Sequence, residues 1–246
     1  MDYWRNKDIW SRRAKTRTEA MEQLFKTETA RASVKLYDSF EENKSDNVPE
    51  FVLVGMTSKT AVFKYDGAVL NFASYKEPGG KFLQGAFSQE ESLCHVSNLY
   101  NILAKQTDYY DYNNKHKNRG LYENRLLYCK NIFFLYDQQE KFCDVITCAA
   151  PNRFLLEKYS LFTEEENEKA LEERIKLIKF AAEDNNVETL ILGAFGCGVF
   201  RQVPETVCKM FLDVFEHSSI ETVVFAIPKD SNFYAFEHVM KERNLL

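Results

Sequence analysis

Short apolar runs alternate with polar stretches from residue 50 onward, and each run has the length of a β-strand. The pattern predicts strands over 51–56, 60–65, 67–73, 132–136, 144–150, 189–192 and 222–227. Apolar residues at helical spacing predict helices after Ser88, Thr163 and Pro204, and a last helix around Phe236. Because strands and helices alternate in the second half, we expect an α/β fold. Its sheet should be mixed and mostly parallel, with helices on both faces.

The first 47 residues follow a different pattern and are predicted to form a helical N-terminal extension to a domain over 48–246. Apolar side chains recur at helical spacing from Trp10 to Leu24, and the extension ends in a polar linker, residues 41–47. Residues 1–35 hold nine Lys or Arg against five Asp or Glu. We favour an appendage that packs on the sheet, because charge on a helix is usually its solvated face. The alternative is a basic arm that contacts a polyanionic substrate.

Composition narrows the class of protein. The 246 residues are 45% hydrophobic and include 20 Phe, which is enough for one large core. The net charge of −5 argues against broad binding of nucleic acid. A local basic patch is compatible with this net charge. With no signal peptide and no apolar run long enough for a bilayer, we expect a cytoplasmic protein without a membrane partner. Six Cys without a CxxC pair and four His without ligand spacing predict free thiols and no metal site.

The stretch from Asn71 to Tyr100 carries the candidate chemistry. A strand leads into the first glycine loop (residues 79–88), which opens with Gly79 and Gly80, and a helix then begins with Gln89-Glu90-Glu91. A strand, a glycine loop and a helix N-terminus form an anion site, because unpaired backbone N–H groups point at the loop. Ser88 and Glu91 have the spacing of a capping box, which alone would make Glu91 structural. Neighbouring helix residues point about 100° apart, so the two glutamates should have different roles.

A second glycine loop (residues 193–200) follows the strand predicted at 189–192. Its three glycines are too dense for a simple turn, which favours a loop that wraps a phosphate: Gly193, Gly196 and Gly198. Ligands bind at the carboxyl ends of parallel strands, so we expect both glycine loops to reach one cleft. Residues 105–125 show no periodicity and carry four Tyr. They could be a surface loop or a lid that reaches the substrate.

The order Gly79-Gly80, seven spacer residues and Gln89-Glu90-Glu91 resembles the signature of the microbial-type poly(ADP-ribose) glycohydrolases, which are built on a macrodomain-like fold. Lys81 stands where that signature has a third glycine, and residues 192–200 resemble the family's second ligand loop. The resemblance implies a macrodomain-like glycosidase domain that needs no cofactor. It would hydrolyse ribosyl bonds of ADP-ribose polymers or conjugates, with a protein or a nucleic acid as acceptor.

The resemblance also implies roles for single residues. Glu91 would be the general acid and then the general base, and Glu90 would bind ribose hydroxyls. The remaining substrate contacts would come from Asn71, Gly79, Gly80, Lys81, Gln89, Gly193, Gly196, Cys197, Gly198, Val199 and Phe200. Cys197 would contribute backbone rather than a nucleophilic thiol, and Lys81 would either contact the diphosphate or point into solvent. Two other classes stay open: a non-catalytic ADP-ribose-binding module and a structural partner protein.

Overall fold

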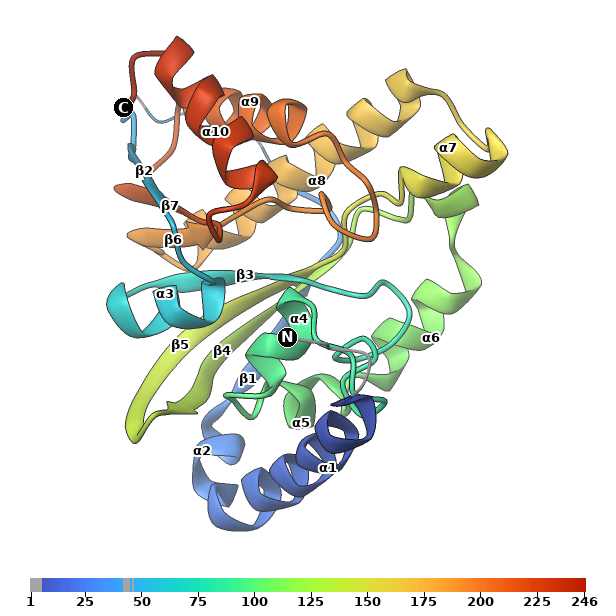
Figure 1. Ribbon diagram of the computed structural model, residues 1–246, viewed down its shortest axis with the longest axis vertical. Coiled ribbons are helices and arrows are strands. Elements are labelled where there is room, and N and C mark those ends of the chain that lie inside the picture. Colours follow the sequence, from blue (N-terminus) through green and yellow to red (C-terminus); the bar gives the residue numbers. More distant parts are fainter. Residues whose placement is uncertain (1–5, 42–44, 46) are drawn as a thin grey trace.

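The computed structural model describes residues 6–41, 45 and 47–246, and its centre is one seven-stranded sheet (Figure 1). The strands are β1 (Ser33–Tyr37), β2 (Glu50–Val54), β3 (Ala68–Phe72), β4 (Leu126–Tyr136), β5 (Gln139–Cys148), β6 (Thr189–Leu192) and β7 (Thr222–Ala226). Their order is β1-β4-β5-β3-β6-β7-β2. Pairs from β5 to β2 are parallel, whereas β1 and β5 run antiparallel to β4. The prediction of a mixed, mostly parallel sheet is therefore confirmed.

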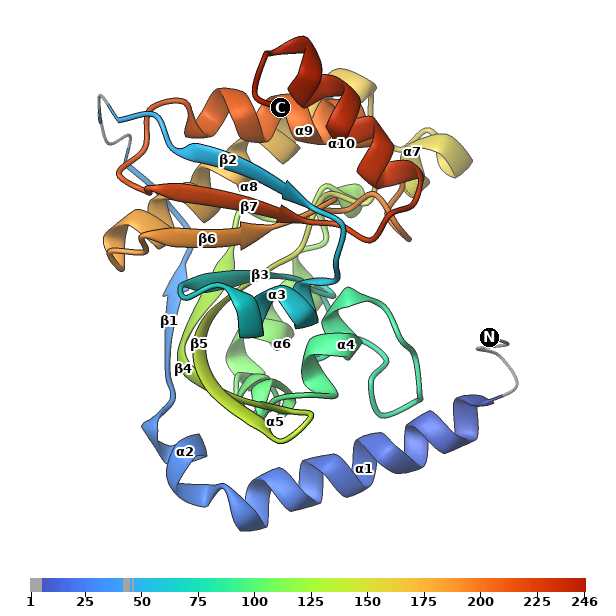
Figure 2. The ribbon, with the colours of Figure 1, turned by 60° about the vertical axis from the view of Figure 1, so that its left-hand side comes forward.

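Helices cover both faces of the sheet, as expected (Figure 2). One face packs against α8 (Glu164–Asp184), α9 (Pro204–Phe215) and α10 (Ser231–Glu242). The other packs against α1 (Lys7–Leu24), α3 (Ser58–Lys64), α4 (Gln89–Cys94), α5 (Leu99–Leu103) and α6 (Thr107–Lys115). Successive side chains of β3 point to opposite faces of the sheet and so belong to different hydrophobic cores. Ala68 and Leu70 face α8 to α10, while Val69 faces α3 and α4. The short helices α2 (Lys26–Arg31) and α7 (Phe154–Tyr159) complete the chain.

The predicted extension over residues 1–47 is helical in α1 and α2 but also supplies β1, which pairs with β4 at the edge of the sheet. α1 buries Ala14 and Met21, so it packs on the domain as favoured from the sequence. Of the polar linker predicted at 41–47, residues 42–44 and 46 lie outside the described part, as do residues 1–5. Within the described ranges, every helix is too short or too polar to cross a bilayer.

The strand predicted at 60–65 is wrong, because these residues belong to helix α3. The side chain of Thr57 accepts a hydrogen bond from the N–H of Thr60 at 3.2 Å and caps the helix. Ser58, Ala61 and Val62 are buried on one side of it, at helical spacing. A local capping signal therefore outweighed the β-forming tendency of the residues that follow.

The single helix predicted after Ser88 is two helices, α4 and α5. Between them, Ser97 forms a bridge with Phe134 of β4, and Asn98 accepts from the N–H of Phe133 at 3.0 Å. The pairing with β4 satisfies the backbone that a continuous helix would have used. Residues 105–125 are likewise not a loop over most of their length, because they form α6 and the 3₁₀ helix η2 (Asn118–Gly120).

Candidate active site

Gln89 joins the first turn of α4 to the end of β3. Its amide nitrogen donates to the carbonyl of Leu70 at 2.7 Å, and its amide oxygen accepts from the N–H of Phe72 at 2.8 Å. β6 pairs with β3 only at Ala68 and Val69, so Gln89 continues the hydrogen bonding of β3 where β6 diverges. The side chain predicted to bind substrate thus fixes the helix that carries the two glutamates against the sheet.

Glu90 is 2% exposed, and its carboxylate faces the segment that follows β3. One oxygen accepts from the N–H of Ser74 at 2.7 Å, and the other accepts from the amide of Asn71 at 3.3 Å. Burial raises the pKa of Glu90 to about 8, and the neighbouring charge of Glu91 also raises it. The hydrogen bond from the N–H of Ser74 acts in the opposite direction and lowers this pKa. Glu90 is therefore largely protonated near pH 7 and can donate as well as accept a hydrogen bond.

Glu91 turns back toward the chain before the helix. One oxygen accepts from the N–H of Lys81 at 3.0 Å, and the other accepts from the N–H of Ser88 at 2.9 Å and from its hydroxyl. The predicted capping box is present. Glu91 is only 5% exposed, so its carboxylate is fixed by both ends of the first glycine loop.

Gly80 lies directly against both carboxylates. A Cβ at Gly80 would be 2.7 Å from Oε1 of Glu91 and 3.0 Å from Oε2 of Glu90. The two carboxylates therefore end beside the same residue, although neighbouring helix residues point about 100° apart. Their Cβ atoms do diverge around the helix, but Glu90 bends toward β3 and Glu91 toward its cap, and both ends meet Gly80. Their hydrogen-bond partners remain different, as two distinct roles require.

Both glycines of this loop have left-handed backbone, with φ of 65° at Gly79 and 60° at Gly80. A side chain at either position would be strained as well as crowded. Lys81, in the place of the family's third glycine, is not among the described residues with positive φ. Its side chain is exposed, and only its N–H holds Glu91. The loop thus accommodates Lys81 without the strain that a positive φ would impose.

Asn71 is completely buried at the end of β3. Its amide nitrogen donates to Glu90 at 3.3 Å and to the hydroxyl of Thr147 on β5 at 3.4 Å. Its Oδ1 is buried without a hydrogen-bond partner in the described part of the chain. In this structure, Asn71 orients Glu90 and leaves one acceptor uncommitted.

The second glycine loop is fixed at its base and open at its tip. Gly196 has φ of 75° and packs against Ala150 and Gln202, and the buried amide of Gln202 donates to the carbonyl of Pro151 at 2.9 Å. By contrast, a Cβ at Gly198 would meet nothing within 4 Å, and Val199 is 80% exposed. The tip therefore presents backbone that a ligand can approach.

Cys197, between these glycines, is partly exposed. Burial raises the pKa of its thiol to about 12, so the thiolate is scarce near pH 7. This supports the interpretation of Cys197 as structural. The other five cysteines are free and buried, as the sequence predicted.

Aromatic contacts join the second glycine loop to the segment that leads from β3 toward the first. Phe72, just before the first loop, packs edge-on against Phe195 of the second, with ring centres 5.7 Å apart. Phe200 packs on Tyr122 at 6.0 Å, and Tyr122 stacks on Tyr75 at 4.1 Å. The second glycine loop therefore lies beside the residues that follow β3, and its convergence with the first loop on one cleft stays a prediction.

Tyr75 and Tyr122 were not identified from the sequence. Tyr75 follows β3, and its hydroxyl donates to the carbonyl of His116 at 2.8 Å and accepts from the N–H of Glu123 at 3.1 Å. Asn113 of α6 donates to the carbonyl of Tyr75 at 2.9 Å. The concentration of Tyr in residues 105–125 was the only signal. These contacts pack that segment against the residues that follow β3.

α1 braces the first glycine loop from below (Figure 2). The hydroxyl of Ser11 donates to the carbonyl of Leu83 at 2.6 Å. Gly85, with φ of 80°, approaches α1 so closely that a Cβ would lie 2.2 Å from the carbonyl oxygen of Lys7. The loop that holds Glu91 is thus fixed from both sides. Across the residues that the structure describes, no three His, Cys, Asp or Glu side chains gather in a way that could hold a metal.

Comparison with known proteins places this site in a family. The model of the microbial-type PARG catalytic domain matches residues 8–137, more than half of the 246 residues, including the first glycine loop and both glutamates. No curated protein matches.

Solved structures extend the likeness to the second glycine loop. The poly(ADP-ribose) glycohydrolase from Thermomonospora curvata is 24% identical with a TM-score of 0.83, over 94% of this chain and 99% of that one. Another structure of that enzyme, bound to the inhibitor ADP-HPD, gives 24% identity and a TM-score of 0.82 over the same shares. The enzyme from Deinococcus radiodurans in complex with ADP-ribose is 28% identical with a TM-score of 0.72, over 92% of each chain.

Proposed function

The chain belongs to the microbial-type poly(ADP-ribose) glycohydrolase family, and from this premise we propose that Glu91 is the general acid and base of its reaction. Family members are glycohydrolases, so this protein is a glycosidase that acts on O-glycosidic ribosyl bonds of ADP-ribose polymers or conjugates. The observation that carries the proposal is the convergence of Glu90 and Glu91 on Gly80, at the N-terminus of α4 and beside a second glycine loop.

Glu91 would protonate the departing oxygen of the ribose–ribose bond. The anomeric carbon would then carry positive charge in an oxocarbenium-like transition state, which a neighbouring diphosphate stabilises. Glu91, now a carboxylate, would take a proton from the water that attacks this carbon. The hydroxyl of Ser88 can donate or accept, so it can hold the Glu91 side chain in both protonation states.

Glu90 would fix the sugar while Glu91 moves the proton. Because its pKa is raised to about 8, Glu90 can donate a hydrogen bond to one ribose hydroxyl near pH 7. Asn71 holds one of its oxygens in place. A sugar fixed in this way presents its anomeric carbon to Glu91 in a constant orientation. This orientation speeds the reaction, because the reacting groups no longer have to find one another.

The two loops would bind the rest of ADP-ribose. The diphosphate would lie along the backbone N–H groups of the second glycine loop, whose tip is open around Gly198. Phe200, which is half-buried and packs on Tyr122, offers an aromatic ring for the adenine or its ribose. We extend the proposal to a macrodomain-like, cytoplasmic enzyme. Its acceptor would be a protein, another ADP-ribose unit or a nucleic acid.

A binding module without activity would need the same loops but no proton donor. The enzyme is favoured because Glu91 is fixed by three donors from two segments, although one capping bond would suffice for a helix N-terminus.

The test is release of ADP-ribose from a panel of substrates: poly(ADP-ribose), an ADP-ribosylated peptide and an ADP-ribosylated oligonucleotide. Each is incubated with the full chain, with and without EDTA, and the products are separated by chromatography. We expect release from at least the polymer and no effect of EDTA. ADP-ribose binding without release from any substrate would identify a binding module instead.

A further inference from the structure

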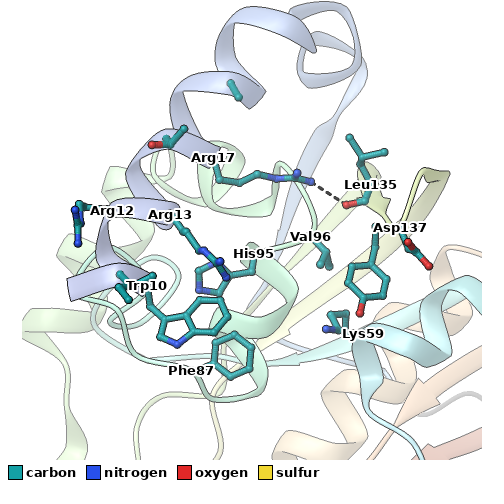
Figure 3. A pocket seen from close by; sticks show the side chains of 14 residues that line it. Trp10, Arg12, Arg13, Arg17, Lys59, Phe87, His95, Val96, Leu135 and Asp137 are labelled. Atoms are coloured by element: carbon teal, nitrogen blue, oxygen red, sulfur yellow. Dashed lines mark hydrogen bonds between the residues drawn. The ribbon is translucent and has the colours of Figure 1, made fainter. Parts of the chain in front are cut away.

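A cavity of about 980 Å³, here called the α1 cavity, lies between α1 and the body of the domain (Figure 3). α1, α3 and the two ends of α4 contribute to its wall, whose central residues are Trp10, Arg13, Arg17, Lys59, Phe87 and His95. Apart from Phe87, which lies in the first glycine loop, these residues are separate from the ADP-ribose site described above. A cavity of this volume is large enough for a nucleotide-sized ligand.

Positive charge dominates the wall. Arg12, Arg13, Arg17 and Lys59 line the cavity, and Asp137 is the one acidic residue among the lining side chains. In the part of the chain that the structure describes, none of the four cations lies within ion-pair distance of a carboxylate. On a protein with net charge −5, four cations that have no carboxylate partner among the described residues form a local anion site.

Arg17 is the most deeply placed of these cations. Its guanidinium donates to the carbonyl of Leu135 at 3.0 Å (Figure 3), while its Nε is buried and has no hydrogen-bond partner among the described residues. Burial lowers its pKa, but an arginine still remains charged at neutral pH. A half-buried guanidinium can bind a phosphate through charge-assisted hydrogen bonds.

Aromatic rings form the floor beside these cations. The ring of Trp10 lies 4.7 Å from Phe87 and 5.2 Å from His95, measured between centres. Burial lowers the pKa of His95 to about 4, so its imidazole is neutral near pH 7. Its Nε2 is buried and unpartnered within the described residues. A set of neutral rings next to cations is the combination that binds a base and its phosphates.

The floor is also connected to the catalytic carboxylate. The N–H of His95 bonds to the carbonyl of Glu91 at 2.9 Å, so His95, the C-cap of α4, lies about one helical turn beyond Glu91. Phe87 directly precedes Ser88, which donates to the Glu91 carboxylate. The wall of the α1 cavity and the Glu91 carboxylate are thus carried by the same short helix, α4, and by the residues that flank it.

We propose that the α1 cavity binds a second ADP-ribosyl unit of a polymeric substrate, with its diphosphate on Arg13, Arg17 and Lys59 and its adenine on the ring of Trp10. This inference rests on the proposed function and adds to it a second binding site for the substrate. It also gives α1 the role of a basic arm, in addition to its packing against the first glycine loop.

The test compares chain lengths. The variant Arg13→Met/Lys59→Met removes two cations and keeps the aliphatic stems. The matched control Lys15→Met removes one cation from α1 at an exposed position outside the cavity. Each is measured for kcat/KM on a polymer of about ten units and on a peptide that carries one ADP-ribose. Binding of fluorescent polymer is also titrated at two salt concentrations, with each substitution combined with Glu91→Gln to prevent turnover.

We expect the double variant to lose about tenfold in polymer affinity and in polymer kcat/KM, since each lost charged contact weakens binding by roughly that factor or less. The salt dependence of polymer binding should also become flatter. Activity on the single-unit peptide should not change, and Lys15→Met should resemble the wild type on both substrates. Trp10→Leu should weaken polymer binding without changing its salt dependence.

Three results would overturn the inference. The double variant could match Lys15→Met on the polymer, or it could lose activity equally on both substrates, as a destabilised first glycine loop would. A single-stranded RNA of equal charge could compete as well as unlabelled polymer, which would assign the cavity to nucleic acid. Absence of turnover in the wild type would instead contradict the proposed function, while the binding titrations would still decide about the cavity.

Discussion

The two glycine loops differ in how firmly the protein holds them. In the first glycine loop, Gly80 lies against two carboxylates, Lys81 and Ser88 donate to Glu91, and Gly85 lies against α1. The second glycine loop is anchored at Gly196 but has free space around Gly198. The first loop therefore fixes the groups that react, and the second leaves backbone accessible to the substrate.

This difference follows from the chemistry of each loop. Proton transfer needs an acid held within a fraction of an ångström, which requires locked side chains around it. A phosphate is bound by backbone N–H groups, which need access more than rigidity. The first loop is held by the side chains of Gln89, Glu90 and Glu91. These side chains accept hydrogen bonds from backbone N–H groups before the loop and at its start.

The largest effect should come from Gly80→Ala. The new methyl group would meet Oε1 of Glu91 at 2.7 Å on a backbone with φ of 60°. We expect the free energy of unfolding to fall by roughly 1–3 kcal/mol and turnover to fall by about 10²-fold or more, because Glu91 must move. Gly198→Ala is the matched control in the second loop and should change stability by less than about 0.5 kcal/mol. Urea unfolding measures stability, and release of ADP-ribose measures turnover. Similar losses of stability and turnover in both variants would contradict the difference between the two loops.

The next effect concerns the pH dependence of stability. The pKa of Glu90 is raised to about 8 in the folded protein from an ordinary value near 4.5. Between these values, the folded state binds more protons than the unfolded state, so Glu90 makes the protein less stable as the pH rises from about 4.5 to about 8. Glu90→Gln should flatten this decline. Urea unfolding of both proteins at pH 5 and pH 8 tests it, and parallel declines would mean that Glu90 is not the group responsible.

A smaller effect is expected at Lys81. If its exposed ammonium contacts the diphosphate, Lys81→Met should weaken ADP-ribose binding and make the affinity less dependent on salt. Lys81→Gly should lose the same charge contribution, because the loop already tolerates this position without a positive φ. Calorimetric titration at two salt concentrations measures both. Unchanged affinity in the two variants would place Lys81 in solvent.

The smallest effect should be that of Cys197→Ser. Burial raises the pKa of this thiol to about 12, and the account gives it no chemical role. Turnover should stay within about twofold of the wild type, because no transition-state contact is removed. Alkylation by iodoacetamide that abolished activity in the wild type but not in the variant would show that the thiol lies close to bound substrate.

Much of the fold follows from local pattern. The parallel strands are buried apolar runs, and the capping box predicted at Ser88 begins α4. The helix predicted after Thr163 is α8, which also begins with a capping box. β1 was missed because it is a short edge strand with three exposed residues in five, so its apolar content is low. The residues of α3 were assigned to a strand because their composition outweighed the Thr57 cap in the prediction.

The site could be predicted only in part. Gln89, Glu90 and Glu91 are recognisable because they are contiguous, and helix geometry alone suggested different roles for the glutamates. The stack of Tyr75 on Tyr122 and the contact of Gly85 with α1 join segments far apart in sequence. No local pattern encodes such pairs, because they depend on how β3, α6 and α1 pack together.

The central claim is that Glu91 transfers a proton and is more than a helix cap. The direct measurement is turnover of poly(ADP-ribose) by Glu91→Gln, together with the shift in melting temperature produced by ADP-ribose. The substitution retains the size of the side chain but removes the transferable proton. The account predicts that turnover falls by about 10²-fold or more, while ADP-ribose at a hundredfold excess over its dissociation constant still stabilises the variant by about 2.7 kcal/mol. Equal turnover in the variant and the wild type would contradict it.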